Sequence, residues 1–268
     1  LRREVIGDEL ARAGQERVGR VFAKNPFDVY HVRSPWEGLA VPAGETIVYE
    51  VNGLASIETQ SRHPELYARP DLREKLRKQE LLLMDRAALL LTPSKVTAEY
   101  LVDLGAAPKQ IVVVPNSPTI PLESNGQPSE RSDVLRCVYI GTLSSWQGLD
   151  LALRALVGSG VAFELQVRTP APERDRRALE RLALRLGCIE QVRIEGPLDP
   201  VELGAFLRTQ DLGLAPLAAC ERNLVQGGMP LKILDYMAAG LPVLAPEMPI
   251  VRELLGSCLL YTSDAADE

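Results

Sequence analysis

The chain has 268 residues, of which 46% are hydrophobic and 25% are charged, as in an ordinary globular protein with room for two domains. The formal net charge of −6 argues against a protein that binds nucleic acids through general positive charge. No apolar run is long enough to cross a bilayer, so the sequence predicts no membrane-spanning helix.

The first part of the chain alternates predicted helices and strands. Helical spacing of apolar residues predicts helices over residues 5–23, 71–86 and 94–105, and short apolar runs predict strands over residues 27–35, 45–53, 88–94 and 111–117. Ser94 and Gly105 are suited to cap the two ends of the third helix. Because its later strands are continuously apolar, this part indicates a parallel sheet.

A second alternating series follows a segment that has no apolar period. Residues 117–133, "SPTIPLESNGQPSERSD", are rich in proline, serine and glycine and indicate an interdomain linker. After them come predicted strands over residues 135–141, 163–168, 191–196, 212–217 and 242–245, with helices over residues 149–156, 172–187 and 200–208. The sequence therefore predicts two α/β domains, with ligands bound in the crevice at the carboxyl ends of their strands.

The two ends of the chain look incomplete. The final stretch "CLLYTSDAADE" (Cys258–Glu268) resembles the translation of a sequencing-library adapter, with a natural tail as the alternative, and is set aside. The opening is already helical in pattern and does not begin with Met. We therefore expect a fragment, inactive in this form. The remaining cysteines, Cys137, Cys188 and Cys220, show no C-x-x-C spacing, which favours a reducing compartment.

Several chemistries lack their motifs. No Asp-x-Asp pair is present and the only histidines are His31 and His63, so the sequence predicts no metal site. There is no P-loop and no G-x-S-x-G nucleophile elbow. We expect His31 in the core or on a sheet face and His63 in a loop.

The stretch "GGMPLKILDYMAAGLPVLAP" (Gly227–Pro246) contains a short helix with an unusual beginning. Gly228 is suited to be its cap, and Pro230 fits the first turn, where a missing N–H is no loss. We expect its apolar face, Leu231, Leu234 and Ala238, to pack on a sheet.

This helix places a cation where the backbone is already partly positive. Lys232 in the first turn is unfavourable unless something negative lies nearby, such as a phosphate at the glycine-rich helix N-terminus. Asp235 shares its face and could accept hydrogen bonds from two ribose hydroxyls. An exposed ion pair between these two residues is the alternative.

Other strand ends offer further contacts. The loop "GTLSSWQG" runs from Gly141 at the end of a strand to Gly148 before a helix, and its backbone N–H groups could face phosphate. Trp146 in this loop is either a pocket wall or packing. Gly196 follows a strand, and Arg168 ends one, where it could reach phosphates or face solvent.

Taken in order, these elements resemble the donor-binding half of family 4 glycosyltransferases. The phrase "DYMAAGLPV" matches the "EAMAxGxPV" phrase of that family, with Asp235 in place of glutamate. In the first half, "VYEVNG" and "LLLTPSKVTAEYLVDLGAAPKQIVVVPNS" resemble the family's acceptor-side segments. The resemblance covers residues 27–255 and implies the GT-B fold, two Rossmann-like domains facing a crevice.

The sequence departs from the family pattern at four positions. Thr142 stands where the loop arginine binds diphosphate, and Gln147 stands where the loop lysine does. Gly227 replaces the first glutamate of the Glu-x7-Glu motif, and Asn52 stands where many relatives have histidine. Lys232 is therefore the candidate to supply the lost positive charge.

The resemblance gives domain boundaries and candidate site residues. It implies an acceptor-side domain over residues 1–116, a linker over 117–133, a nucleotide-sugar domain over 134–257 and an artefactual tail over 258–268. The donor-binding candidates are Gly141, Thr142, Trp146, Gln147, Gly148, Arg168, Gly196, Gly228, Met229, Pro230, Leu231, Lys232 and Asp235. The acceptor-side candidates are Arg33, Glu50 and Asn52.

The resemblance also implies an activity. It is transfer of a sugar from a UDP- or GDP-sugar to a saccharide or lipid-linked acceptor, with retention, without metal or cofactor and without a nameable protein nucleophile. Polysaccharide biosynthesis and a cytoplasmic location, with contact at the inner face of the membrane left open, are family-level expectations. The alternatives are a catalytically degraded GT-B protein that binds nucleotide or a partner, and a GT-B sugar-nucleotide epimerase.

Overall fold

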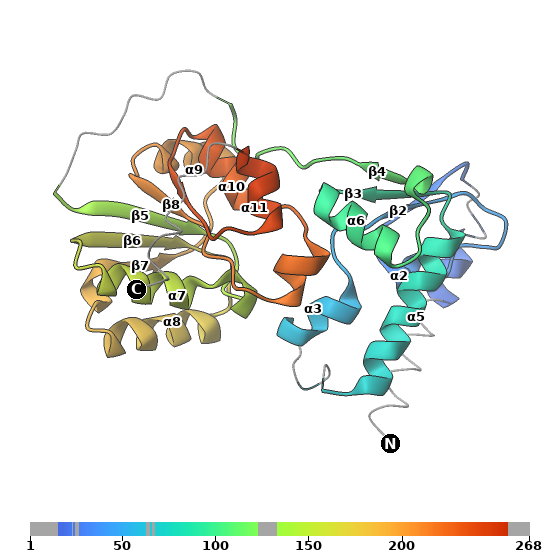
Figure 1. The fold of residues 1–268 in the computed structure, drawn as a ribbon, viewed down its shortest axis with the longest axis horizontal. Coiled ribbons are helices and arrows are strands. Elements are labelled where there is room, and N and C mark those ends of the chain that lie inside the picture. The colour runs from blue at the N-terminus through green and yellow to red at the C-terminus, as the bar shows by residue number, and fades with distance from the viewer. Residues whose placement is uncertain are drawn as a thin grey trace. The chain divides into compact units, whose positions relative to one another are not determined.

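The computed structural model describes residues 16–22, 24, 27–62, 65, 68–122 and 133–256. The greater part of the first predicted helix, His63, part of the predicted linker and the tail Cys258–Glu268 lie outside the described residues. The chain forms two compact units (Figure 1). The first comprises Leu1–Pro115 with Val225–Met229, and the second comprises Asn116–Leu224 with Pro230–Glu268. The sequence-based domain boundaries placed residues 225–229 in the second domain, whereas the structure groups them with the first unit.

The first unit is built on a sheet of four parallel strands. The strands β1 (Tyr30–Val32), β2 (Ile47–Glu50), β3 (Leu89–Thr92) and β4 (Ile111–Val113) pair in chain order. Around them lie α2 (Pro35–Gly38), α3 (Ala55–Arg62), α5 (Pro70–Arg86), α6 (Lys95–Asp103) and the 3-10 turn η1 (Pro108–Gln110). All four strands were predicted, whereas α2 and α3 were not.

The ends of α6 are capped by neighbouring residues in the sequence, whereas the start of α3 is capped from another helix. Ser94 accepts a hydrogen bond from the Thr97 N–H (3.1 Å), and Gly105 follows the helix with a φ of +101°, so both predicted caps of α6 are confirmed. The fully buried carboxylate of Glu80 on α5 accepts from the N–H (3.0 Å) and hydroxyl (2.6 Å) of Ser56. Glu80 therefore satisfies the start of α3 from another helix, which no local sequence signal announces.

The second unit is built on a sheet of five parallel strands in the order β7-β6-β5-β8-β9. Its strands are β5 (Leu135–Ile140), β6 (Phe163–Arg168), β7 (Val192–Glu195), β8 (Leu212–Leu214) and β9 (Val243–Leu244). Its helices are α7 (Leu149–Gly158), α8 (Glu173–Arg185), α9 (Pro200–Leu207), α10 (Leu231–Ala238) and α11 (Pro249–Leu255), with short turns η2 (Ser145–Gln147) and η3 (Ile189–Gln191). The π-helical turn η4 (Arg222–Gln226) begins in this unit and ends in the residues assigned to the first. The predicted α/β class with two parallel sheets is confirmed.

Side chains of β5 alternate between two layers of this unit. Cys137 and Tyr139 lie in the core with α7 and α8, whereas Val138 and Ile140 lie in the core with α9 and α10. Figure 1 shows α7 and α8 on one face of the sheet and α9, α10 and α11 on the other. Burial of β5 on both faces explains the apolar run of residues 137–140 within it.

The predicted details of α10 were wrong in two respects. Its N-cap is Pro230, not Gly228, and no side chain caps it. Leu231 is 42% exposed, and the buried residues of the helix are instead Lys232, Ile233, Asp235 and Tyr236. The buried face is therefore partly polar, and of the three residues expected to pack on the sheet, Ala238 does contact the core. Among the described residues no helix is both long and apolar enough to cross a membrane.

Candidate functional site

The order of the second sheet contains one reversal. The chain moves outward from β5 through β6 to β7 and then crosses to β8 on the other side of β5. Loops that leave β5 and β8 therefore diverge at their carboxyl ends, and open α/β sheets bind ligands in that crevice. The predicted loop Gly141–Gly148 follows β5, and the chain that follows β8 leads toward α10.

Glycines shape the loop after β5. Gly141 has a φ of +128° and Gly148 a φ of +67°, a backbone region that other residues rarely adopt. A Cβ at Gly148 would also lie 2.5 Å from the Pro216 carbonyl oxygen, in the chain after β8. The carbonyl of Trp146 accepts hydrogen bonds from the Ala218 N–H (2.9 Å) and from the side chain of Asn223 (2.8 Å). The two loops are thus fixed to one another.

Lys232 reaches this loop from the first turn of α10. Its side chain is only 7% exposed, and its ammonium donates to the side-chain oxygen of Gln147. The same nitrogen lies 4.2 Å from the ring centroid of Tyr139. A Cβ built on Gly141 would lie 3.5 Å from it. The structure therefore brings Gly141, Gln147 and Lys232 together.

The charge of Lys232 is poorly compensated. Burial, together with the nearby charge of Arg222, lowers the pKa of Lys232 to about 7. Of the ion pairs among the described residues, none involves Lys232. Buried charges are ordinarily paired because an unpaired ammonium in a low-dielectric site is costly. The alternative that the sequence left open, an exposed ion pair with Asp235, is therefore contradicted, because both side chains are buried and they do not pair with each other.

The position of α10 depends on Tyr236. Its hydroxyl accepts from the Ile140 N–H (3.0 Å) and shares its own proton between the carbonyls of Val138 (3.3 Å) and Leu214 (3.2 Å). A Cβ at Gly213 on β8 would lie 2.6 Å from the Tyr236 ring, so the helix sits directly on the sheet there. This contact fixes where the first turn of α10 presents Lys232.

Asp235 is occupied by the chain that enters the second unit. It is 3% exposed, and its oxygens accept from the N–H (2.6 Å) and hydroxyl (2.9 Å to each oxygen) of Thr119. The N–H of Ile120 also lies 3.3 Å from Oδ1. One carboxylate thus attaches the segment around Thr119 to α10, whereas sequence reasoning placed Thr119 in the predicted linker.

Three other donor candidates, Arg168, Trp146 and Thr142, differ in how far they are buried. Arg168 does not face solvent, because its side chain is 18% exposed, lies 4.7 Å from the Phe206 ring centroid and pairs with Glu195 at 2.5 Å. Trp146 is 6% exposed, with the Arg222 guanidinium 5.1 Å from its ring centroid. The side chain of Thr142 lies 3.3 Å from the Ser144 hydroxyl, on the exposed side of the loop.

Three further glycines and a methionine of the predicted donor half belong to different units of the structure. No atom lies within 4 Å of a Cβ built on Gly196. Gly227, Gly228 and Met229 belong to the first unit. A Cβ at Gly227 would lie 2.9 Å from Val96 in that unit, and its φ of +77° suits glycine.

The acceptor-side candidates meet in the first unit. Glu50 at the end of β2 pairs with Arg33 (3.2 Å) and accepts from the side chain of Asn52 (2.5 Å). His31 on β1 lies 3.0 Å from the other oxygen of Glu50. Its side chain is 51% exposed between two buried strand residues, so of the two expected positions, core or sheet face, His31 takes the second. Its place two residues before Arg33 on the same predicted strand was the one sequence signal that could have placed His31 beside Arg33 and Glu50.

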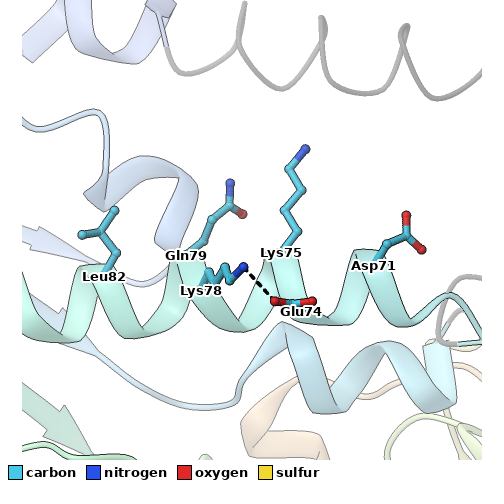
Figure 2. Close-up of a pocket in the computed structure, with 6 residues that line it drawn as sticks. All are labelled: Asp71, Glu74, Lys75, Lys78, Gln79 and Leu82. Atoms are coloured by element: carbon cyan, nitrogen blue, oxygen red, sulfur yellow. Dashed lines mark ion pairs between the residues drawn. The ribbon is translucent and has the colours of Figure 1, made fainter.

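A shallow pocket lies elsewhere, along one face of α5 (Figure 2). It is lined by Asp71, Glu74, Lys75, Lys78, Gln79 and Leu82. Glu74 and Lys78 form an exposed ion pair at 2.7 Å. The pocket contains none of the predicted site residues, and we assign it no function. No group of metal-ligating side chains occurs among the described residues.

Sequence reasoning missed the partners of the predicted residues. Tyr139 and Thr119 touch the two key side chains of α10, and Arg222 and Asn223 hold the loop. Tyr139 follows the strand alternation of a core residue, so only its position two residues before Gly141 distinguishes it. No local pattern distinguishes Thr119.

Solved structures of other proteins share the fold of this chain, which is the GT-B fold. Sucrose-phosphate synthase from Thermosynechococcus elongatus has a TM-score of 0.72 and 16% identity, over 90% of this chain and 61% of its own. Anabaena HepE in complex with UDP-glucose has a TM-score of 0.67 and 16% identity, over 90% of this chain and 65% of HepE. The pneumococcal O-GlcNAc transferase GtfA, solved with UDP and GlcNAc, has a TM-score of 0.62 and 11% identity, over 88% and 46%.

Family comparisons identify the chain further. Residues 135–268 match the family described as Glycosyl transferases group 1, and residues 9–117 match Glycosyltransferase Family 4. The chain therefore belongs to the family 4 glycosyltransferases. It spans less than two thirds of the length of these structural relatives. No protein of curated function matches it.

Proposed function

We propose that the whole protein is a retaining, metal-independent glycosyltransferase. It transfers a sugar from a nucleotide diphosphate sugar, UDP- or GDP-linked, to a saccharide or lipid-linked acceptor. The observation that carries this proposal is the buried ammonium of Lys232 beside the glycine loop after β5. A diphosphate at this place would be the anion that Lys232 lacks, and it would favour the charged form of the lysine.

The geometry suggests how the leaving group would be stabilised. Lys232 and the N–H groups of the loop beginning at Gly141 would face the diphosphate as negative charge develops on it, which is an electrostatic role. This replaces the arginine and lysine of the usual family loop, whose positions are held by Thr142 and Gln147. The resemblance supplies no protein nucleophile, and we assign none.

Asp235 is the proposed ribose ligand. Its Oδ2 accepts only from the Thr119 hydroxyl among the described contacts, whereas Oδ1 accepts from both Thr119 and Ile120. A carboxylate oxygen has two acceptor positions, so a ribose hydroxyl would share Oδ2 with Thr119. On the acceptor side, we propose Arg33, Glu50 and Asn52, with His31 as the fourth member of that polar cluster.

A second candidate is a protein that binds nucleotide without turnover. It is favoured by the departures from the family pattern at Thr142, Gln147 and Gly227, where charged or polar contacts to the donor are missing. One assay separates the candidates. The whole protein is offered UDP- and GDP-sugars, with and without saccharide acceptors and with a chelator, and nucleotide release is followed. Acceptor-dependent release that survives the chelator supports the glycosyltransferase, and binding without release supports the second candidate.

The role of Lys232 has its own test. Lys232→Ala should weaken UDP or GDP binding more than tenfold, on the order of 1.5 kcal/mol, because a charge-assisted contact is lost. Calorimetry measures the affinity. Lys78→Ala is the control, since Lys78 is an exposed lysine paired with Glu74 on α5. An unchanged affinity for the nucleotide in Lys232→Ala would remove Lys232 from the site.

A further inference from the structure

Tyr139 touches both parts of the proposed phosphate site. It lies near the end of β5 and is fully buried. Its ring lies under the ammonium of Lys232, 4.2 Å from centroid to nitrogen, and its hydroxyl donates to the Thr142 carbonyl in the loop. The hydroxyl and that ammonium lie 3.6 Å and 3.5 Å from the position that a Cβ at Gly141 would take. Tyr139, Lys232 and the glycine loop therefore border the same small space.

We propose that Tyr139 is a positioning residue of the donor site, with its ring fixing the ammonium of Lys232 and its hydroxyl fixing the loop. This inference rests on the proposed function of that site. Lysine has a long, flexible side chain, and holding it in one place costs rotamer entropy on each binding event. A side chain that holds the ammonium before the ligand arrives removes that cost.

An aromatic ring is suited to this task because it carries no net charge. A carboxylate at the same place would neutralise Lys232 and would repel the phosphates. The electron-rich face of a ring attracts the cation without neutralising it. Burial raises the pKa of Tyr139, so the phenol keeps its proton and its hydroxyl acts as a donor. Gln147, which accepts from the same ammonium, is likewise uncharged.

A purely structural role is the competing explanation. Tyr139 belongs to the core that also contains Leu153 and Leu165, so removing its ring would disturb packing whatever its function. The two roles differ in what happens when Lys232 is absent. A ring that acts through Lys232 contributes to nucleotide affinity only while the lysine is present, whereas a packing ring contributes equally in both backgrounds.

The experiment uses Tyr139→Phe and Tyr139→Leu in the whole protein, each with Lys232 and with Lys232→Met. The affinity for UDP is measured by calorimetry, and thermal unfolding verifies that each variant is folded. Tyr139→Phe keeps the ring and releases Thr142. Tyr139→Leu also removes the ring. Tyr49→Phe is the matched control, because Tyr49 is another fully buried strand tyrosine, in the first unit.

Three results are expected. Tyr139→Phe weakens UDP binding about threefold to tenfold in both backgrounds, through the loop alone. Replacing that Phe by Leu weakens binding a further threefold to tenfold with Lys232, and less than about twofold with Lys232→Met. Tyr49→Phe leaves the affinity unchanged.

If the step from Phe to Leu costs the same affinity in both backgrounds, or if Tyr139→Phe binds UDP normally, the proposal is overturned. If Lys232→Met itself binds UDP normally, the proposed function of the site fails instead.

Discussion

Lys232 is a buried cation that contacts an aromatic ring and an amide. Tyr139 and Gln147 hold its ammonium, and the charged group that acts on it is Arg222, which has the same sign. Together with burial, this lowers its pKa to about 7, from 10.5 in an unfolded chain. A residue of this kind reduces the stability of the empty protein and becomes favourable when an anion binds. That balance is typical of side chains kept for binding rather than for stability.

The stability of the protein should therefore depend on pH through Lys232. Between about pH 7 and the ordinary lysine pKa of 10.5, the unfolded chain binds one more proton than the folded chain, so the free energy of unfolding rises with pH. From pH 7 to about pH 9 the gain attributable to Lys232 is about 2 kcal/mol. Urea unfolding of the original protein and of Lys232→Met at both pH values measures it.

The comparison with Lys232→Met isolates this contribution, because all other titrating groups are common to both proteins. Lys232→Met should show a correspondingly smaller rise, and it should be the more stable of the two at pH 7. Equal pH dependence in the two proteins would mean that Lys232 keeps an ordinary pKa and that its burial is matched by a partner. Saturating UDP should also flatten the dependence, since it favours the charged form.

At this scale the sequence predicted the key lysine but not its surroundings. Lys232 was recognisable because a cation in the first turn of a helix conflicts with the helix dipole. Gly141 was recognisable from its place between a strand and a helix. Tyr139 was not, because a tyrosine in a strand that alternates with other apolar residues is normally core. For His31 the sequence left the core and a sheet face open, since alternation alone does not say which face of an edge strand is covered.

At the scale of elements, the segment around Thr119 acts as part of α10. The carboxylate of Asp235 receives two donors from Thr119 and one from Ile120, so the segment and the helix are attached through a buried charge. Asp235 then has two candidate roles, which are to hold this segment and to bind ribose. They make different predictions for ligands with and without a ribose.

Asp235→Asn distinguishes these roles when UDP is compared with inorganic pyrophosphate. If the carboxylate binds ribose, the variant weakens UDP binding about tenfold and leaves pyrophosphate binding within about twofold, because the second ligand has no sugar hydroxyls. Calorimetry measures both affinities. An equal loss for the two ligands would mean that Asp235 only holds the segment, and no loss would mean that it lies outside the site. Thr119→Val is the companion variant, since it removes the hydroxyl partner without touching the carboxylate.

Strands were easier to predict than helices in this chain. Apolar or alternating runs between turn residues predicted them, and all nine described strands fall within predicted ranges. Helix α3 gave no sequence signal, whereas α10 was predicted and only the contact that positions it was missed. The start of α3 is held by Glu80 from α5, and α10 is positioned by Tyr236 on the sheet rather than by an apolar stripe. These contacts join residues far apart in sequence, so local patterns do not contain them.

At the scale of the whole chain, the second unit contains most of the proposed donor residues. Tyr139, Gln147, Lys232 and Asp235 all belong to it, whereas Gly228 and Met229 belong to the first unit. If the nucleotide is held mainly by the second unit, its binding energy stabilises that unit. A ligand at about 100 times its dissociation constant adds about 2.7 kcal/mol to the stability of the state that binds it.

Hydrogen exchange of the whole protein, with and without UDP, measures where that energy acts. Core amides of β5, β6 and β8 should exchange up to about 100-fold more slowly with UDP, because their exchange requires opening of the unit that binds the nucleotide. Amides of β2 and β3 should change less than about twofold. Lys232→Met at the same UDP concentration should lose most of the protection. Equal slowing of amide exchange in both sheets would contradict the assignment of the nucleotide to the second unit. If UDP slows exchange in β5, β6 and β8 and also at the amides of Gly228 and Met229, those two residues join the donor contacts.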